Sequence, residues 1–354
     1  MALDIDFEEI FKNAKEQLGQ VNILMAGKTG VGKSTLLNAV FGEDMAETGV
    51  GKPITKTLKE YSKEDHFYHI IDTKGFELET YEQLKHDLID EILRRRTADP
   101  KQHIHIMWYC VNDTGKRIED AELEFIKDIT HLDIPVVVVF TQSWSGDVSF
   151  YNKVTQDNFD IINHAIRVLA LPMPTPIGPI PSFGLDKLVE LTYELVPEVA
   201  KKAFAAAQKV NDEVTRKNIQ KIIAVAAAAA GTAGAVPIPF SDAIALAPIQ
   251  IAMLAAISMA YGLSMSDSFL KTIVASAAGV TGATYAGRAI ASNLIKLIPG
   301  AGAVVGGTIS AGTAMTLTTL MGEAYYRALA YIKKNNLEFN AATISRTFVK
   351  ELKS

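Results

Sequence analysis

The chain has 354 residues and a net charge of −5; 48% of its residues are hydrophobic, 21% are charged and one is a cysteine. This length favours two domains, and the composition is too apolar for a disordered chain. The single cysteine excludes a disulfide framework and a cysteine-based zinc site, and the acidic balance argues against sequence-independent binding to nucleic acid.

The N-terminal region predicts a cytoplasmic protein that begins with an amphipathic helix. The opening MALDIDFEEIF is acidic where a secretory signal carries basic residues, so we do not expect secretion. Apolar residues at helical spacing over 4–19 define residues 1–19 as this helix. We expect its apolar stripe to pack on the first domain, with a membrane or partner contact as the alternative.

Strands and helices alternate between residues 20 and 197. We expect strands at 21–27, 66–72, 103–112 and 134–141, and helices at 33–41, 82–97, 118–130, near 154–170 and at 184–196. The run IPVVVVFT at 134–141 is continuous and β-branched, as in a strand covered on both faces. The alternation predicts an α/β domain over 20–197, with a mostly parallel sheet and helices on both faces.

Beyond Pro197 the chain changes character. Residues 198–221 are interpreted as a polar connecting helix, and residues 222–354 as an all-α domain. Residues 219–320 contain only six charged side chains, and breaks rich in proline and glycine predict turns between helices. The second domain is therefore expected to be helical and low in charge.

The segment GKTGVGKS at 27–34 matches the phosphate-binding pattern G-x-x-x-x-G-K-[ST], with an apolar strand before it and a helix after it. Glycines let backbone N–H groups turn towards phosphate oxygens, and the helix points its positive end at them. Lys33 then reaches the outer phosphates, and the Ser34 hydroxyl is a ligand for Mg²⁺. The nucleotide-binding residues predicted here are Gly27, Lys28, Thr29, Gly30, Val31, Gly32, Lys33, Ser34 and Thr35.

Two further segments are expected to complete a site for Mg²⁺ and a γ-phosphate. Asp72 and Gly75 form a D-x-x-G at the end of an apolar strand; such an aspartate holds Mg²⁺ through water, and the glycine N–H meets the γ-phosphate. A threonine from 49–61 must complete the Mg²⁺ shell, and the candidates in order of preference are Thr55, Thr57 and Thr48. The predicted catalytic residues are Lys33, Thr55 and Gly75, and the predicted metal ligands are Ser34, Thr55 and Asp72.

These motifs resemble those of Era-like GTPases of the translation-factor class, and the P-I-T form at 53–55 resembles immunity-related GTPases. The later segments PIPFSDAIALAPIQIAMLAAISMAYG (237–262) and IPGAG (298–302) are similar to the helical domain of YcjF-type bacterial proteins. The first resemblance covers residues 20–197 and implies a GTP-hydrolysing switch, with GTP or GDP as ligand and Mg²⁺ as cofactor. The base contacts that it implies come from Thr141, Gln142 and Ser182.

The guanine-reading motif departs from the family pattern N/T-K-x-D. The position reads Thr141–Gln142–Ser143–Trp144, and tryptophan cannot accept the two hydrogen bonds from guanine that the aspartate accepts. Asp147, three residues further on, is a candidate substitute. Loss of these bonds should relax base discrimination, so guanine is expected from the resemblance, and an ATP-using P-loop NTPase is an alternative.

Catalytic assistance is expected to come from outside these motifs. Phe76 follows the D-x-x-G where many relatives have a water-orienting glutamine, and Gly30 stands where potassium-activated relatives carry asparagine. Positioning and charge neutralisation alone leave such sites slow, on the order of 10⁻⁴ to 10⁻² per second. We therefore expect low intrinsic turnover, raised by self-association or by an activating partner.

Two clusters outside the motifs receive structural interpretations. The arginines at 94–96 could reach a neighbouring molecule, but cations are also favoured at the C-terminal end of a helix, and we prefer that role. The four histidines near strand starts are expected to be partly exposed strand residues and not metal ligands; they are His66, His69, His103 and His105.

The low-charge region admits two interpretations. Residues 222–241, 243–266 and 297–322 lack charges and are long enough to span a bilayer, but the first and third are rich in small residues. They form either a tight bundle or a module that contacts membrane lipid. The resulting hypothesis is a slow GTP switch whose nucleotide state controls the helical domain, in the cytoplasm or at a membrane. The alternative is a non-catalytic, nucleotide-dependent scaffold or membrane-inserting effector.

Overall fold

The computed structural model describes residues 6–42, 52–54, 58–62, 67–73, 81–234, 242–263, 266–277 and 310–354. The chain divides into two compact units, Gly19–Val214 and the combination of Met1–Leu18 with Thr215–Ser354. They are called the sheet unit and the helical unit.

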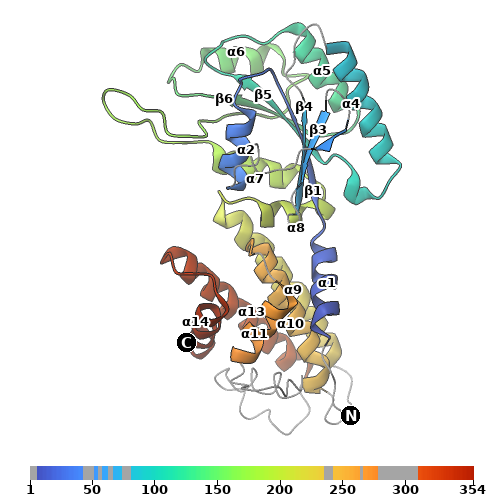
Figure 1. Ribbon diagram of the computed structural model, residues 1–354, viewed down its shortest axis with the longest axis vertical. Coiled ribbons are helices and arrows are strands. Elements are labelled where there is room, and N and C mark those ends of the chain that lie inside the picture. The colour runs from blue at the N-terminus through green and yellow to red at the C-terminus, as the bar shows by residue number, and fades with distance from the viewer. Residues whose placement is uncertain are drawn as a thin grey trace. The chain divides into compact units, whose positions relative to one another are not determined.

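A seven-stranded mixed sheet forms the centre of the sheet unit, with the strand order β2-β3-β4-β1-β5-β6-β7 (Figure 1). The strands span Val21–Ala26 (β1), Lys52–Pro53 (β2), Leu58–Ser62 (β3), Tyr68–Thr73 (β4), Ile106–Asn112 (β5), Val136–Thr141 (β6) and Ala165–Arg167 (β7). β1 and β4 to β7 are parallel, whereas β2 and β3 pair antiparallel at one edge. The prediction of a mostly parallel sheet is confirmed.

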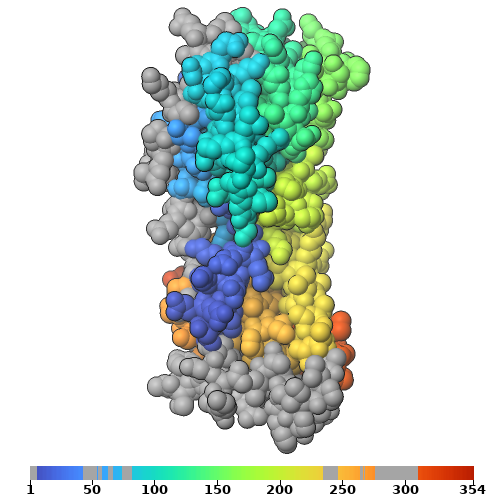
Figure 2. Space-filling view, turned by 90° about the vertical axis from the view of Figure 1, so that its right-hand side faces the viewer, coloured from blue at the N-terminus to red at the C-terminus, as the bar shows by residue number. Residues whose placement is uncertain are grey.

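Helices cover both faces of this sheet, as the sequence predicts. They are α2 (Lys33–Phe41), α4 (Tyr81–Arg96), the 3-10 helix η2 (Pro100–Gln102), α5 (Asp120–His131), α6 (Ser149–Asp157), α7 (Leu185–Leu195) and α8 (Glu198–Ala207). Neighbouring residues of β1 enter separate cores: Ile23 packs with residues of α2, α7 and α8, and Leu24 with residues of α4 and α5. On the second face α4 and α5 lie side by side (Figure 2), joined by a 2.5 Å ion pair between Lys85 and Asp128.

The segment after α6 corrects one predicted element. We expect a helix near 154–170, but α6 ends at Asp157 and a short edge strand, β7, follows. The Asn158 side-chain amide donates to the Val154 carbonyl (2.9 Å), which satisfies a carbonyl of the last helical turn. Backbone bonds to β6 then hold β7 extended. Helical periodicity could not distinguish these residues, because tertiary hydrogen bonds decide their conformation.

The helical unit consists, in its described residues, of α1 (Phe7–Leu18), most of α9 (Asp212–Gly234), α10 (Asp242–Ala260), α11 (Asp267–Ala277), α13 (Ala311–Lys334) and α14 (Ala341–Lys353). α13 packs against α10 and α14, and α14 also packs against α11. The prediction that the first helix packs on the first domain is wrong, because α1 contacts α10 and α11. Phe7, Ala14 and Leu18 of α1 are buried, and the Lys271 ammonium of α11 lies 5.4 Å from the centre of the Phe7 ring.

The predicted connecting helix at 198–221 is two helices, α8 and α9, separated at 208–211. The Gln208 side-chain carbonyl accepts the N–H of Asn211 (2.7 Å), and the Asn211 side chain caps the first turn of α9. α8 belongs to the sheet unit, whose core contains Phe204. Side-chain capping at the break therefore interrupts what the composition presents as one polar helix.

Close approach between helices explains the small side chains of the helical unit. A Cβ added at Gly322 of α13 would lie 2.7 Å from Ile223 of α9 and 3.0 Å from Met253 of α10. α10 is apolar on all sides, and Leu254 and Ile257 are fully buried. The low charge of these helices therefore reflects a buried core. Among the residues that the structure describes, no helix combines the length and the hydropathy that crossing a bilayer requires.

Candidate functional site

A glycine-rich loop joins β1 to α2 at the carboxyl end of β1. Gly27 has a φ of +133°, and a Cβ there would lie 2.3 Å from the carbonyl oxygen of Cys110 on β5. Gly30 and Gly32 have φ values of +77° and +96°, which side chains of L residues rarely adopt. The three glycines therefore allow the tight turn that brings backbone N–H groups to one place.

α2 begins at Lys33, directly after this loop. No side chain among the described residues caps its N-terminus, so its first N–H groups are open to an anion. Lys33 Nζ donates to the carbonyl oxygens of Gly27 (2.7 Å) and Lys28 (3.1 Å), which holds the ammonium against the loop. Ser34 and Thr35 are exposed on the first helical turn. This geometry suits a bound phosphate.

Asp72 lies near the end of β4, paired in register with Met25 of β1. Burial raises the pKa of its carboxyl group to about 6, although Lys33 and Lys59 favour the charged form. Its Oδ1 atom is buried and has no hydrogen-bond partner among the described residues. A buried, unpaired carboxylate oxygen beside a phosphate loop is a donor that suits hydrated Mg²⁺, so Asp72 fits this ion.

The end of β6 is tied to the glycine-rich loop by two side chains. Thr141 Oγ1 donates to the carbonyl oxygen of Val31 and lies 3.1 Å from that of Val111. Gln142 Nε2 donates to the Gly30 carbonyl (3.1 Å). The structure thus brings Thr141 and Gln142, two of the predicted nucleotide-binding residues, to the glycine-rich loop.

Trp144 and Asp147 follow on the next loop. The Trp144 side chain is exposed. The Asp147 carboxylate accepts hydrogen bonds from Lys116 Nζ (2.5 Å) and from the N–H of Ser149 (2.9 Å), and these bonds hold its pKa well below the usual range. An ionised carboxylate is therefore present near the end of β6, and it is engaged with Lys116 and with the backbone of Ser149.

Arg167 of β7 fixes the backbone of this loop. Its guanidinium lies 2.8 Å from the Asp113 carboxylate and donates to the Ser145 carbonyl (2.6 Å), and both charged side chains are largely buried. Sequence reasoning missed Arg167, Asp113 and Lys116. One sequence feature could have indicated Asp113: it is an aspartate that directly follows the apolar strand β5.

Lys28 connects the glycine-rich loop to α5. Its ammonium lies 3.0 Å from both Glu119 and Glu122, and Glu122 also accepts a hydrogen bond from the Tyr109 hydroxyl (2.8 Å). Burial lowers the pKa of Lys28, but the two carboxylates outweigh burial and the pKa is raised. Because the side chain is engaged with α5, a contact from Lys28 to a nucleotide would come from its backbone.

Some predicted residues cannot be placed. Those that lie outside the described residues are Thr55, Gly75, Thr57, Thr48 and Phe76. Ser182 is described and exposed, next to a backbone bridge between Phe183 and Leu169. Leu169 follows β7, which runs parallel to β6, so Ser182 lies at the same edge of the sheet as Thr141.

Two of the three arginines at the end of α4 form ion pairs within the protein. Arg94 and Arg95 both donate to the Glu91 carboxylate, and Arg95 also reaches Glu60 of β3 (3.1 Å). These pairs support the structural role over that of a supplied catalytic arginine. Arg96 makes no such pair with a residue that the structure describes.

His105 differs from its expected exposure. It is buried, and its Nδ1 accepts the backbone N–H of Asn22 (3.0 Å). Burial lowers the pKa of His105, which favours the neutral ring.

Within the part of the chain that the structure describes, no three His, Cys, Asp or Glu residues are grouped so as to hold a metal ion.

A family model described as 50S ribosome-binding GTPase matches residues 22–142. Magnetosome membrane protein 22 of Magnetospirillum gryphiswaldense is 36% identical over 97 residues, which are 27% of this chain and 48% of that protein. GTPase Era of Alkaliphilus metalliredigens is 22% identical over 208 residues, 57% of this chain and 63% of that protein. The chain therefore spans less than two thirds of the length of these relatives.

Solved structures give weaker likenesses. A probable GTP-binding protein engB has 20% identity and a TM-score of 0.37, with 49% of this chain and 98% of that chain covered. Era of Aquifex aeolicus bound to GDP.AlF4⁻ has 21% identity and a TM-score of 0.33, with 51% and 58% covered. The family match includes β1 from its second residue, the glycine-rich loop, Asp72 and Gln142, so residues 22–142 are similar to a P-loop GTPase domain.

Proposed function

We propose that this protein is a switch that binds GTP, hydrolyses it slowly with Mg²⁺, and uses its nucleotide state to control the helical unit. One observation carries the proposal: four predicted site residues lie together around the glycine-rich loop at one edge of the sheet. They are Lys33, Asp72, Thr141 and Gln142. The GTPase family model that matches residues 22–142 supports hydrolysis as the reaction.

In this proposal the loop N–H groups and Lys33 bind the outer phosphates, while Ser34, Thr55 and Asp72 hold Mg²⁺, Asp72 through water. The ion supplies charge neutralisation on the phosphate oxygens. Thr55 and the Gly75 N–H contact the γ-phosphate and are released on hydrolysis. With phenylalanine after the D-x-x-G, turnover stays slow until a second copy of the chain or an activating partner supplies the missing group.

Guanine is the base that we propose. Gln142 is held beside the loop by Gly30, so its aliphatic stem offers a surface on which a base can lie. An ATP-using NTPase is the second candidate, and the observation that favours it is Trp144 at the position of the base-reading carboxylate. Asp147 is the proposed substitute if guanine is read.

The helical unit is the proposed output of the switch. α9 starts at Asp212, includes Val214 of the sheet-unit core, and continues as the first long helix of the helical unit. A change in the nucleotide loops would then alter how the helical unit docks, self-associates or contacts lipid. The similarity to a magnetosome membrane protein supports lipid as a partner.

Nucleotide binding tests the site. We expect GTP with Mg²⁺ to bind more tightly than ATP or XTP, and Lys33→Ala to abolish binding of all three, because the charge-assisted contacts to phosphate are lost. Lys153→Ala, on the exposed side of α6, is the matched control. Equilibrium titration with labelled nucleotides measures both effects. Binding that survives Lys33→Ala would overturn the site, and a preference for ATP would select the second candidate.

Hydrolysis and coupling need separate measurements. Steady-state phosphate release with and without lipid vesicles distinguishes the slow GTPase from a non-catalytic scaffold, which would show none above the Lys33→Ala background. Hydrogen exchange over 215–354 should differ between the GDP, GTP-analogue and nucleotide-free states. Identical exchange and identical lipid binding in all three states would contradict the coupling and leave the nucleotide site intact.

A further inference from the structure

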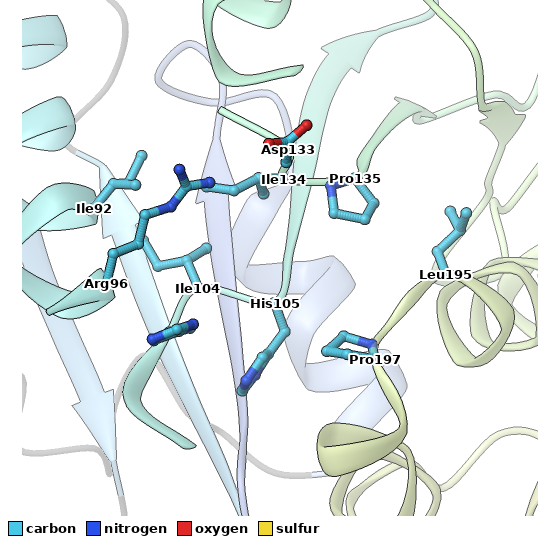
Figure 3. Close-up of a pocket in the computed structure, with 10 residues that line it drawn as sticks. Ile92, Arg96, Ile104, His105, Asp133, Ile134, Pro135, Leu195 and Pro197 are labelled. Atoms are coloured by element: carbon cyan, nitrogen blue, oxygen red, sulfur yellow. The ribbon is translucent and has the colours of Figure 1, made fainter. Parts of the chain in front are cut away.

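A pocket lies at the edge of the sheet opposite the glycine-rich loop (Figure 3). Its walls come from the segments just before β5 and β6, the end of α4, and the junction of α7 and α8, and its volume is about 320 Å³. The glycine-rich loop follows the carboxyl end of β1, which runs parallel to β5. The pocket is therefore separate from the nucleotide site.

Arg96 brings a cation to this pocket. Its neighbours Arg94 and Arg95 are paired with Glu91, whereas Arg96 makes no hydrogen bond or ion pair to any residue in the described ranges. In Figure 3 the guanidinium lies between Ile92 and the Asp133–Pro135 segment. A guanidinium presents its N–H donors in a planar fork that matches the geometry of a carboxylate or a phosphate.

His103 supplies a second polar group. Its Nε2 atom is buried and finds no hydrogen-bond partner among the described side chains and backbone. The position of the residue is fixed, because its carbonyl oxygen accepts a hydrogen bond from Asn22 Nδ2 (2.7 Å). His105 differs, since its Nδ1 accepts from Asn22 and its Nε2 lies 3.1 Å from the Pro100 carbonyl. Of the two histidines that line the pocket, His103 is thus the one with a ring nitrogen that lacks a hydrogen-bond partner among the described residues.

The other walls are mostly apolar. They are formed by Ile92, Ile104, Ile134, Pro135, Leu195 and Pro197. The acidic residue at the pocket, Asp133, is exposed, and Figure 3 shows its carboxylate at the upper rim, away from His105 and Pro197. A wholly apolar ligand would leave Arg96 and His103 without partners, and an inorganic ion would leave the apolar walls uncovered.

We propose that this pocket binds a small organic anion, a carboxylate or a phosphate monoester that carries a short apolar group. The charged head lies on Arg96 and His103, and the apolar part contacts the isoleucines. The volume is at the lower end of the range of ligand pockets, which fits a ligand of this size. Ligand binding here would join the end of α4, which follows the D-x-x-G segment, to the start of α8.

Methyl NMR of the full chain tests the proposal, because three isoleucines line the pocket. Isoleucine δ1 methyl groups are labelled with ¹³C and the protein is titrated with butyl phosphate, hexanoate, inorganic phosphate and 1-butanol, with GDP and Mg²⁺ present to occupy the glycine-rich loop. We expect saturating shifts at Ile92, Ile104 and Ile134 with butyl phosphate, hexanoate or both, and weaker binding of inorganic phosphate and 1-butanol. Whichever anion binds more tightly identifies the head group.

Two variants and one control locate the binding. Arg96→Ala should weaken binding about tenfold or more, because charge-assisted hydrogen bonds are lost. His103→Gln should weaken it less. Arg94→Ala, two residues earlier on the same helix and paired with Glu91, should bind like the unmodified chain. Absence of shifts at tens of millimolar, equal shifts with 1-butanol, or unchanged affinity in Arg96→Ala would each overturn the proposal.

Discussion

By the resemblance to Era-like GTPases, Trp144 takes the place of the aspartate that would read guanine, and its side chain is exposed. Trp144→Asp would supply an acceptor for guanine N1 and N2. It should therefore raise the preference for GTP over ITP, which lacks the 2-amino group, by about tenfold or more, since a hydrogen bond to a charged group is worth about 1.5–3 kcal/mol. Competition binding of GTP and ITP gives the ratio, with Trp144→Phe as the control.

The same competition between GTP and ITP in the unmodified chain shows whether another residue already reads the 2-amino group. If it already prefers GTP over ITP and Trp144→Asp changes nothing, another group reads the 2-amino edge. Asp147→Asn should then lower the ratio, because Asp147 is the ionised carboxylate nearest along this loop. A ratio that responds to neither substitution would contradict both assignments.

Lys28 and Arg117 both contact Glu119 but differ in their surroundings. Lys28 also neutralises the buried Glu122, whereas the Arg117 side chain is 74% exposed. Lys28→Ala should reduce the free energy of unfolding by about 1–2 kcal/mol, because a buried carboxylate loses its cation. Arg117→Ala should change it by less than about 0.5 kcal/mol.

Urea unfolding measures these two effects on the same scale. Adding Glu122→Gln to Lys28→Ala should recover part of the loss, since a neutral amide needs no counter-charge. Equal losses for Lys28→Ala and Arg117→Ala, or no recovery in the double variant, would contradict the role given to this contact.

At the level of whole elements, the crossing of α9, α10 and α13 depends on Gly322. Alanine there would place Cβ 2.7 Å from Ile223 and 3.0 Å from Met253, so overpacking should cost about 1–3 kcal/mol; helix propensity returns up to about 1 kcal/mol, and Gly322→Ala should destabilise on balance. Gly312 lies on the same helix, and a Cβ there meets no atom of the described residues within 4 Å. Gly312→Ala should stabilise by about 0.5–1 kcal/mol through helix propensity. Thermal unfolding should therefore shift in opposite directions, and shifts of the same sign would contradict this packing.

The edge strand β3 is joined to α4 through Glu60. A hydrogen bond from His69 (2.9 Å) and the charge of Arg95 outweigh burial and lower the pKa of Glu60 from 4.5 to about 2. Because the folded pKa lies below the unfolded one, this stabilisation is present above about pH 4.5 and is lost as pH falls towards about 2.

Glu60→Gln should therefore make the free energy of unfolding depend less on pH in the acidic range. The free energy of unfolding should fall by about 1–2 kcal/mol less than in the unmodified chain between about pH 6 and pH 3, with allowance for partial exposure. Urea unfolding across this range measures the slope. A variant that loses stability as steeply as the unmodified chain would show that Glu60 does not carry the effect.

The sequence predicts well those elements whose own residue pattern is sufficient to identify them as a helix or a buried strand. β1 and β6 are buried along their whole length, so their apolar runs identify them, and α2 starts and ends where predicted. β7 was missed because its extended form depends on pairing with β6. The short antiparallel strands β2 and β3 likewise carry no strong pattern of their own.

The candidate site divides in the same way. The glycine-rich loop is recognisable because its residue types are fixed by backbone geometry at Gly27, Gly30 and Gly32. The ion pair between Asp113 and Arg167 joins residues 54 positions apart, so no local sequence pattern predicts it. Contacts across the fold therefore had to come from the structure.

For the molecule as a whole, thermodynamic linkage gives a test of the proposed switch. If nucleotide state changes the helical unit, then a change in the helical unit must alter the ratio of GTP to GDP affinity by the same coupling free energy. Gly322→Ala perturbs only helical-unit contacts, so it should shift that ratio, whereas Gly312→Ala should shift it less. A GTP-to-GDP ratio that stays constant in Gly322→Ala would mean that the two units act independently.

Cys110 is the sole cysteine of the chain; it is fully buried, and burial raises the pKa of its thiol to about 12. Thiol reagents attack the thiolate, so the natural sequence should be unreactive towards them without any residue being removed. Cysteines introduced at Ile177 of the sheet unit and Val225 of the helical unit, which are 99% and 68% exposed, would then be the only labelled positions. A pair of fluorophores there would report the separation of the two units in single molecules as nucleotide is bound, hydrolysed and released.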